Sequence, residues 1–184
     1  MYVTPKMVAG MEAVYGRPRV TRLTYQMGEL EFGMVLSSQK ASRAHDVTLY
    51  IFKKGKIVVI RKPMHPAGVY RAPSGGLKPG EGFEEGAKRE AKEETGLDIE
   101  LKRYLYRIQV TFVCGERKIH WTSHVFSARP VGGELIPQDT REIIGIKLAT
   151  LKEMNTSIRG AMLASGITGL IYRAHLHDLV KDVL

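Results

Sequence analysis

Residues Gly75–Leu97, GGLKPGEGFEEGAKREAKEETGL, decide the fold of this chain, because they join a glycine-rich turn to a carboxylate-rich segment. The glycines suit a tight loop whose backbone comes close to a ligand. From Phe83 an apolar residue recurs every fourth position, at Ala87 and Ala91, which predicts a helix whose narrow apolar stripe packs on a sheet. Gly96 is expected to end this helix in a left-handed conformation.

Three glutamates of the predicted helix, Glu90, Glu93 and Glu94, are spaced so that they can converge on one patch. A solvated face held by ion pairs such as Arg89–Glu93 is the simpler interpretation. However, two carboxylates about 4 Å apart repel by roughly 4 kcal/mol at an effective dielectric constant near 20. A divalent cation converts this repulsion into affinity, and hard oxygen ligands select Mg²⁺ or Mn²⁺. The spacing therefore favours a metal site, with a backbone carbonyl of the glycine loop as a further ligand.

The same residues resemble the Nudix box, G-x5-E-x7-R-E-U-x-E-E-x-G-U, at every fixed position. Gly75, Glu81, Arg89 and Glu90 stand at the first four fixed positions, Ala91 follows them, and Glu93–Leu97 supplies the rest. Glu81 lies at the entrance of the helix, where it can cap the helix or join an outer shell. The resemblance is strong over the box and its flanking strands and weak over the first 40 residues.

The resemblance implies an enzyme that hydrolyses the pyrophosphate linkage of a nucleoside diphosphate joined to another group, with Mg²⁺ or Mn²⁺ as cofactor. A small nucleotide is the implied substrate, for example a nucleotide sugar such as ADP-ribose, or a nucleoside triphosphate. A less favoured alternative is the capped or triphosphate 5′ end of RNA. A non-catalytic regulatory Nudix module is a third alternative, but such modules tend to lose box glutamates, and this chain keeps them all.

The match to the motif also implies the metal ligands. Glu90 and Glu94 are expected to be the first ligands, and Glu93 is a third ligand or holds a metal-bound water. The carbonyl of Ser74, or of the glycine after it, is the expected backbone ligand. With Glu93, Arg89 belongs to the predicted catalytic set, and it is expected to orient a glutamate rather than to touch substrate.

The general base and the substrate contacts fall outside the fixed positions of the motif. In relatives the base is sometimes a box glutamate and sometimes an acid on a later loop, so Glu142, just before IIGIKL, is the candidate and Asp139 is the next. Arg61, Lys62 and Arg71 flank the strand and turn that enter the box, where they can bind phosphates. Solvated surface charge is the alternative for each of these three cations.

The length of 184 residues suits one core, and the net charge of +9 favours an anionic partner, either a nucleotide or nucleic acid. The single cysteine, Cys114, excludes an internal disulfide and fits a reducing compartment. No signal-peptide pattern and no apolar run of membrane-spanning length are found, so a soluble cytoplasmic protein without a membrane partner is expected.

We divide the chain into an N-terminal extension, 1–44, and a Nudix domain, 45–184. In the extension the pattern predicts a helix over Pro5–Tyr15, a hairpin or two short strands over Val20–Leu36, and then a polar loop over 37–44. The extension is interpreted as an added layer, a dimerisation arm of a homodimer, or part of the substrate pocket.

The remaining elements follow in the order hairpin, helix, hairpin, strand and helix. This order predicts the α/β class, with a mixed β-sheet covered by helices on both sides. Nudix domains are built as such an α/β/α sandwich, so the pattern and the resemblance agree.

Overall fold

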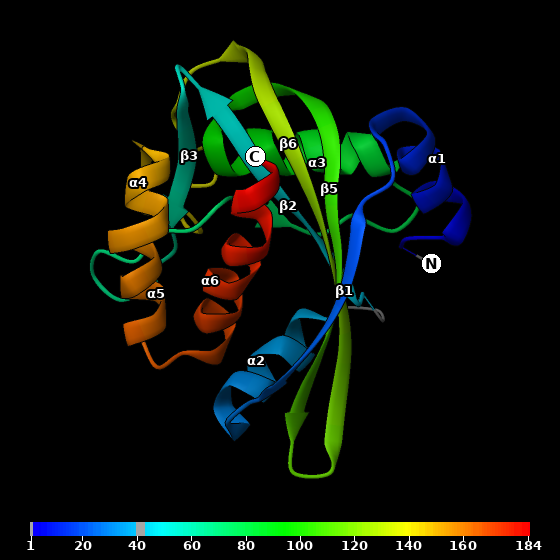
Figure 1. Cartoon of the computed structure of the whole chain (residues 1–184), viewed down its shortest axis with the longest axis vertical. Coiled ribbons are helices and arrows are strands. Elements are labelled where there is room, and N and C mark those ends of the chain that lie inside the picture. Colours follow the sequence, from blue (N-terminus) through cyan, green and yellow to red (C-terminus); the bar gives the residue numbers. More distant parts are fainter. Residues whose placement is uncertain (1, 40–42) are drawn as a thin grey trace.

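The computed structural model describes residues 2–39 and 43–184 and places a mixed seven-stranded sheet between two layers of helices (Figure 1). The sheet order is β1-β5-β6-β2-β3-β7, with β4 paired to β2. The elements in chain order are α1 (Pro5–Tyr15), β1 (Arg19–Gln26), α2 (Glu29–Ser38), β2 (His45–Lys53), β3 (Lys56–Arg61), β4 (Ser74–Gly75), α3 (Phe83–Thr95), β5 (Leu97–Cys114), β6 (Arg117–Gly133), β7 (Gly145–Ala149), α4 (Leu151–Glu153), a π-helical turn (Met154–Ile158), α5 (Arg159–Ala164), α6 (Thr168–Val180) and a 3₁₀ turn (Lys181–Val183).

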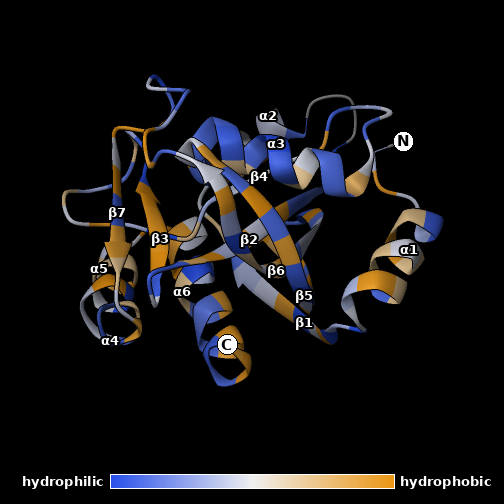
Figure 2. Ribbon diagram, turned by 90° about the horizontal axis from the view of Figure 1, so that it is seen from above, coloured by the Kyte–Doolittle hydropathy of each residue, from blue (hydrophilic) through white to orange (hydrophobic). Residues whose placement is uncertain are grey.

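Each face of the sheet carries its own hydrophobic core. One core receives Met11 of α1 and the apolar stripe of α3. The opposite core receives Phe32 of α2, Met162 of α5 and Leu170 of α6. Figure 2 shows α1 and α6 on opposite sides of the strands. The predicted α/β/α sandwich with a mixed sheet is therefore confirmed.

Helix α3 forms where the sequence predicts it. Its stripe of Phe83, Ala87 and Ala91 is buried against the sheet. Gly96 ends the helix with φ of 76°, in the left-handed region. A β-carbon at this glycine would lie 2.1 Å from the carbonyl oxygen of Ile136, so close packing excludes a side chain there as well.

The hairpin of β2 and β3 opens into a wedge beyond its turn. The two strands pair with each other only at Phe52–Ile57 and Lys53–Lys56. Farther along, the segment before α3 fills the gap, because Arg71 bridges to β3 at Ile60 and β4 pairs with β2. The glycine loop is thus held at the edge of the opened hairpin, where it meets the start of α3.

The predicted helix over Pro5–Tyr15 is confirmed, but the prediction of a hairpin or two short strands over Val20–Leu36 is right only for its first half. β1 joins the sheet as an edge strand parallel to β5, and the second half of the range lies in α2. The apolar residues of that half fit both the two-residue period of a strand and the 3.6-residue period of a helix. Phe32 packs into the core with Val35 one helical turn later, whereas Leu30 and Met34 are exposed.

The acidic first turn of α2 explains why this stretch becomes a helix. Glu29 and Glu31 lie at its positive end, where negative charge is stabilising. Of the predicted loop over 37–44, Ser37 and Ser38 belong to α2, and 40–42 lie outside the described residues. The division at residue 44, the dimerisation arm and the homodimer stay predictions. Within the described residues, no helix is both long and apolar enough to cross a membrane.

Candidate active site

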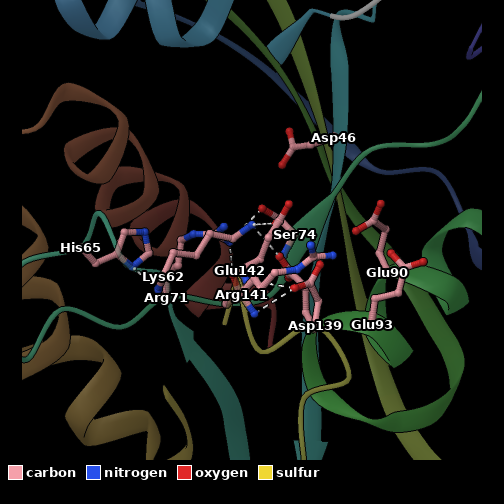
Figure 3. Close-up of polar contacts among 12 residues, drawn as sticks. Asp46, Lys62, His65, Arg71, Ser74, Glu90, Glu93, Asp139, Arg141 and Glu142 are labelled. Carbon is pink, nitrogen blue, oxygen red and sulfur yellow. Dashed lines mark hydrogen bonds and ion pairs between the residues drawn. The ribbon is translucent and has the colours of Figure 1, made fainter. Parts of the chain in front are cut away.

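The glycine loop and α3 border a cavity of about 500 Å³ (Figure 3). One side is formed by the glutamates of α3. Other parts of the wall come from the end of β3, from β6, from the turn before β7 and from α6. The predicted residues that line it are Lys62, Arg71, Ser74, Arg89, Glu90, Glu93, Glu94, Asp139 and Glu142.

Glu94 is the most buried of the three box glutamates. One carboxylate oxygen accepts a hydrogen bond from the backbone N–H of Ser74 at 2.8 Å, and the other lies 3.0 Å from Nζ of Lys62. Lys62 also contacts Glu142, at 2.9 Å. The Oγ of Ser74 accepts a hydrogen bond from Arg71 at 2.8 Å. The wedge between β2 and β3 therefore fixes the glycine loop, Glu94 and two predicted phosphate-binding cations together.

Arg89 lies at the centre of the other acidic residues of the box. Its guanidinium donates to Glu81 at 2.7 Å, to Glu90 at 2.9 Å and to Glu93 at 2.8 Å. It also donates to the carbonyl oxygen of Gly76 at 3.1 Å, which ties α3 to the loop. The hydrogen bond to Glu81, foremost among these contacts, raises the pKa of Arg89.

Glu81 does not cap α3, although its position at the helix entrance allowed that interpretation. Its carboxylate binds Arg89 and accepts the backbone N–H of Lys78. The N-terminal capping contact is made by Glu85 instead, which accepts the backbone N–H of Gly82 at 3.3 Å. Glu81 therefore belongs to the shell around Arg89.

Glu90 approaches the glycine loop so closely that its carboxylate occupies the space of a side chain at Gly75. A β-carbon placed on Gly75 would lie 1.8 Å from Oε2 of Glu90. Burial raises the pKa of the Glu90 carboxyl, while Arg89 opposes that rise and the charges of Glu94 and Glu93 add to it. The carboxylate is therefore held in a site that favours additional positive charge.

The side chains on this patch fit a hard divalent cation by their chemistry, since all of their potential ligand atoms are oxygens. Across residues 2–39 and 43–184, no three His, Cys, Asp or Glu side chains converge as ligands. The contacts explain why: Arg89 draws Glu90 and Glu93 to its guanidinium, and Lys62 draws Glu94. Cations of the chain thus offset the glutamate repulsion, so crowding alone does not demand a metal.

The acids considered as general base lie on a turn at the rim of the cavity. Glu142 precedes β7, and its side chain is 63% exposed. A carboxylate oxygen of Asp139 accepts the backbone N–H groups of Arg141 and Glu142, both at 3.0 Å. This turn, and not the strand, sets the direction in which Glu142 projects.

The three predicted substrate-binding cations separate into two groups. Lys62 and Arg71 line the cavity, whereas Arg61 is not among its lining residues and pairs with Gly145 of β7. Arg71 is almost fully buried, and burial lowers its pKa to about 10. The role of Arg61 in substrate binding stays a prediction without a supporting position.

Asp46 and Arg173 are among the lining residues that sequence reasoning missed. The buried carboxylate of Asp46 receives hydrogen bonds from Arg173 at 2.8 Å, from Trp121 at 2.8 Å and from Ser123. Burial alone would raise the pKa of Asp46, but Arg173 and these hydrogen bonds hold it at about 2. The one signal in the sequence is an acid at the start of the apolar strand HDVTLYIFK.

A model of the NUDIX domain family matches residues 43–165. MutT4, a provisionally named mutator protein of Mycobacterium tuberculosis (strain CDC 1551 / Oshkosh), is 34% identical over 86 residues, which are 47% of this chain and 34% of that protein. The NAD-capped RNA hydrolase NudC of Stutzerimonas stutzeri (strain A1501) is 32% identical over 83 residues, 45% of this chain and 28% of that protein. The chain thus spans about a third of the length of these curated relatives.

Solved structures share the fold. An ADP-ribose pyrophosphatase from Streptococcus suis 89-1591 aligns with a TM-score of 0.50 and 18% identity, over 76% of this chain and 90% of that one. A NUDIX hydrolase from Nitrosomonas europaea aligns with a TM-score of 0.50 and 20% identity, over 77% of this chain and 95% of that one. The family match over 43–165, which includes the complete box from Gly75 to Leu97, leads to one conclusion: the chain belongs to the NUDIX family.

Proposed function

We propose that this protein hydrolyses the pyrophosphate linkage of a nucleoside diphosphate joined to another group, such as a nucleotide sugar or a nucleoside triphosphate, with Mg²⁺ or Mn²⁺. The observation that carries this proposal is that side chains of both charges line one cavity. Box glutamates line it together with Lys62, Arg71 and Arg173, and Lys62 is in contact with Glu94. A diphosphate bridging a cation held by the glutamates and the side-chain cations would be neutralised from both sides.

Glu90, Glu94 and Glu93, with the carbonyl of Ser74, are the residues we assign to hold the ion. When bound, the ion supplies Lewis-acid neutralisation of the phosphate charge. Arg89 is a positioning residue, because its contacts are to glutamates and a loop carbonyl.

Glu142 is the proposed general base, with Asp139 as the alternative. Glu142 is exposed at the rim, where it can take a proton from water. Its ion pair with Lys62 connects it to Glu94, so both carboxylates share one cationic anchor. Asp139 fixes the turn that carries Glu142, and this contact gives it a positioning role.

A second candidate function is hydrolysis at the 5′ end of RNA. The net charge of +9 favours a polyanionic substrate, and one relative of this chain is named as an NAD-capped RNA hydrolase. Salt-sensitive RNA binding together with slow turnover of free nucleotides would favour this alternative. The single cysteine supports a cytoplasmic setting for either activity.

The decisive experiment measures phosphate-containing products from a panel of nucleotides with Mg²⁺ or Mn²⁺, for the wild type and Glu94→Gln. We expect kcat to fall by about a hundredfold or more in the variant, because loss of one metal ligand removes several kcal/mol of transition-state stabilisation. Glu84→Gln is the matched control, since Glu84 lies on the same helix but pairs with Lys88. Equal turnover by wild type and Glu94→Gln would refute the ligand assignment.

The choice of base is tested by the pH dependence of kcat/KM in Glu142→Gln and Asp139→Asn. Substitution of the true base should lower kcat/KM about 10²–10⁴-fold and remove the acidic limb of the pH profile. Substitution of a positioning residue should lower kcat/KM but leave that limb in place. If Asp139→Asn removes the limb and Glu142→Gln keeps it, the two roles are exchanged.

A further inference from the structure

A second cavity, of about 390 Å³, adjoins the active-site cavity. Its wall comes from α2, from the segment after β3 and from the start of α6. The residues common to both cavities are Lys62, Arg71 and Arg173. Three cations therefore stand at the boundary between a site lined by glutamates and a second site of different chemistry.

The wall of the second cavity is mainly aliphatic and rich in methionine. Met27, Val35 and Leu170 lie in its depth, and all three belong to or pack on a hydrophobic core. At its lip, Leu30 is 86% exposed and Met64 is 67% exposed. Large apolar side chains exposed together at the edge of a cavity are typical of a ligand-binding groove. Methionine adapts well to flexible apolar ligands.

Two polar side chains of this cavity, Glu31 and His65, make hydrogen bonds within the chain. The carboxylate of Glu31 accepts the backbone N–H groups of Thr168 and Gly169, at 3.2 and 3.3 Å, which anchors α2 to the start of α6. Nδ1 of His65 accepts the backbone N–H of Lys62 at 3.2 Å. Burial, together with the nearby Arg71 and Lys62 charges, lowers the pKa of His65 to about 4, so this imidazole is neutral at pH 7. Away from the shared cations, a sugar or a base would find few hydrogen-bonding partners here.

We propose that this second cavity binds an aliphatic group, alkyl or isoprenyl, that is esterified to the substrate's diphosphate. The proposal rests on the proposed function and names the group on the other side of the scissile linkage. The diphosphate lies over the shared cations, with the nucleotide end toward the box glutamates and the chain in the apolar cavity. Most of the apolar wall comes from α2 and α6, which lie outside the family match over 43–165.

The test compares hydrolysis of the methyl, butyl and octyl esters of adenosine 5′-diphosphate, with ADP-ribose as a polar reference. We expect kcat/KM to rise with chain length, by up to about fourfold for each methylene that is buried, and to exceed the value for ADP-ribose. Equal kcat/KM across the esters, or a preference for ADP-ribose, would overturn the proposal while leaving pyrophosphate hydrolysis in place.

Two variants of α2 locate the effect. Met34→Glu places a charge at the lip of the cavity and should lower kcat/KM for the octyl ester at least tenfold, which flattens the chain-length series. Leu36→Glu is the matched control, because Leu36 is 52% exposed on the same helix and does not line the cavity. The same flattening in both variants would show that the chain does not enter this cavity.

Calorimetric titration separates a failure of this inference from a failure of the proposed function. Octyl diphosphate should bind wild-type protein at least tenfold more tightly than methyl diphosphate, with a more negative heat-capacity change. If no ester is hydrolysed but this difference is present, the cavity assignment holds and the pyrophosphohydrolase proposal fails. Equal affinities of the two diphosphates would overturn the cavity assignment.

Discussion

Gly75 shows how one missing side chain shapes the site. Its backbone lies in β4, paired with Val47, and its φ is not positive, so alanine is compatible with its conformation. The space of a β-carbon is instead occupied by the carboxylate of Glu90. Glycine is required here for close approach to Glu90 and not for backbone freedom.

Gly75→Ala should therefore reduce activity more than stability. The carboxylate of Glu90 is the end of a flexible side chain and can move away, so we expect a fall of more than tenfold in kcat/KM with a small change in Tm. Gly10→Ala is the control, because a β-carbon at Gly10 meets no atom within 4 Å. Undiminished kcat/KM in Gly75→Ala would show that the position of Glu90 is not needed.

The acidic cluster depends as much on its cations as on its glutamates. Repulsion among Glu90, Glu93 and Glu94 suggests from sequence that a metal must be present. The structure places Arg89 and Lys62 among these carboxylates, with contacts of 2.8 to 3.0 Å. Coulomb attraction at such distances is similar in size to the repulsion it offsets. Lys62 lies outside the box in sequence, so the motif could not reveal its contribution.

At the scale of elements, α6 is fastened to the sheet by a buried ion pair. Arg173 of α6 binds Asp46 of β2, and its other amino group donates to Thr48 at 2.7 Å. Tyr172 of the same helix donates to Ser123 at 2.7 Å. The ion pair fixes Arg173 at the boundary of the two cavities, so the proposed contact of Arg173 with the diphosphate depends on the position of α6.

Asp46→Asn should weaken the attachment of α6 to the sheet and change how the free energy of unfolding depends on pH in acid. Loss of one partner leaves Arg173 buried without its counter-charge, which costs about 3–5 kcal/mol in the free energy of unfolding. The pKa of Asp46 is about 2 in the folded protein against 3.8 in the unfolded chain. Its contribution, on the order of 2 kcal/mol, is therefore complete above about pH 4 and is lost as the pH falls toward 2.

Urea unfolding between pH 2 and 5 tests this expectation. The stability of the wild type should fall more steeply with decreasing pH than that of Asp46→Asn. Asp98→Asn is the control, since Asp98 forms an exposed ion pair with Lys92 that should contribute little. Parallel pH profiles for wild type and Asp46→Asn would mean that Asp46 is not held as an anion in the folded protein.

At the scale of the whole molecule, the proposed ion should stabilise the fold, because it binds the folded chain and not the unfolded one. A free ion concentration of 100 times Kd adds about 2.7 kcal/mol to the free energy of unfolding. For a chain of this length this corresponds to a rise in Tm of about 5–10 °C, because each kcal/mol shifts Tm by about 2–4 °C. Differential scanning calorimetry with added Mg²⁺ or Mn²⁺, and then with chelator, measures the rise and its reversal.

The double variant Glu90→Gln/Glu94→Gln identifies where the ion binds. It should show no rise in Tm with Mg²⁺ or Mn²⁺ and no turnover of nucleotides. Glu84→Gln should respond as the wild type does. A full rise in the double variant would place the stabilising ions elsewhere on the chain.

The sequence by itself determined the elements whose signals are local. Helix, sandwich and family could be predicted because their signals lie in short stretches of residues. These signals are the apolar stripe of α3, the left-handed Gly96, the hairpin turn after β2 and the order of elements. The stretch from Glu29 to Ser38 shows the limit, because its apolar residues fit a strand and a helix equally well. Packing on the core, together with the acidic first turn at Glu29 and Glu31, selects the helix.

Only the tertiary structure decided which residues complete the site. Lys62 reaches Glu94 because the wedge of β2 and β3 holds the glycine loop beside the end of β3. Asp46 meets Arg173 because α6 docks across the sheet. Such pairings join positions far apart in the chain, so no spacing pattern in one sequence reveals them. Their energy comes from burial and charge complementarity, which exist only once the sheet has formed.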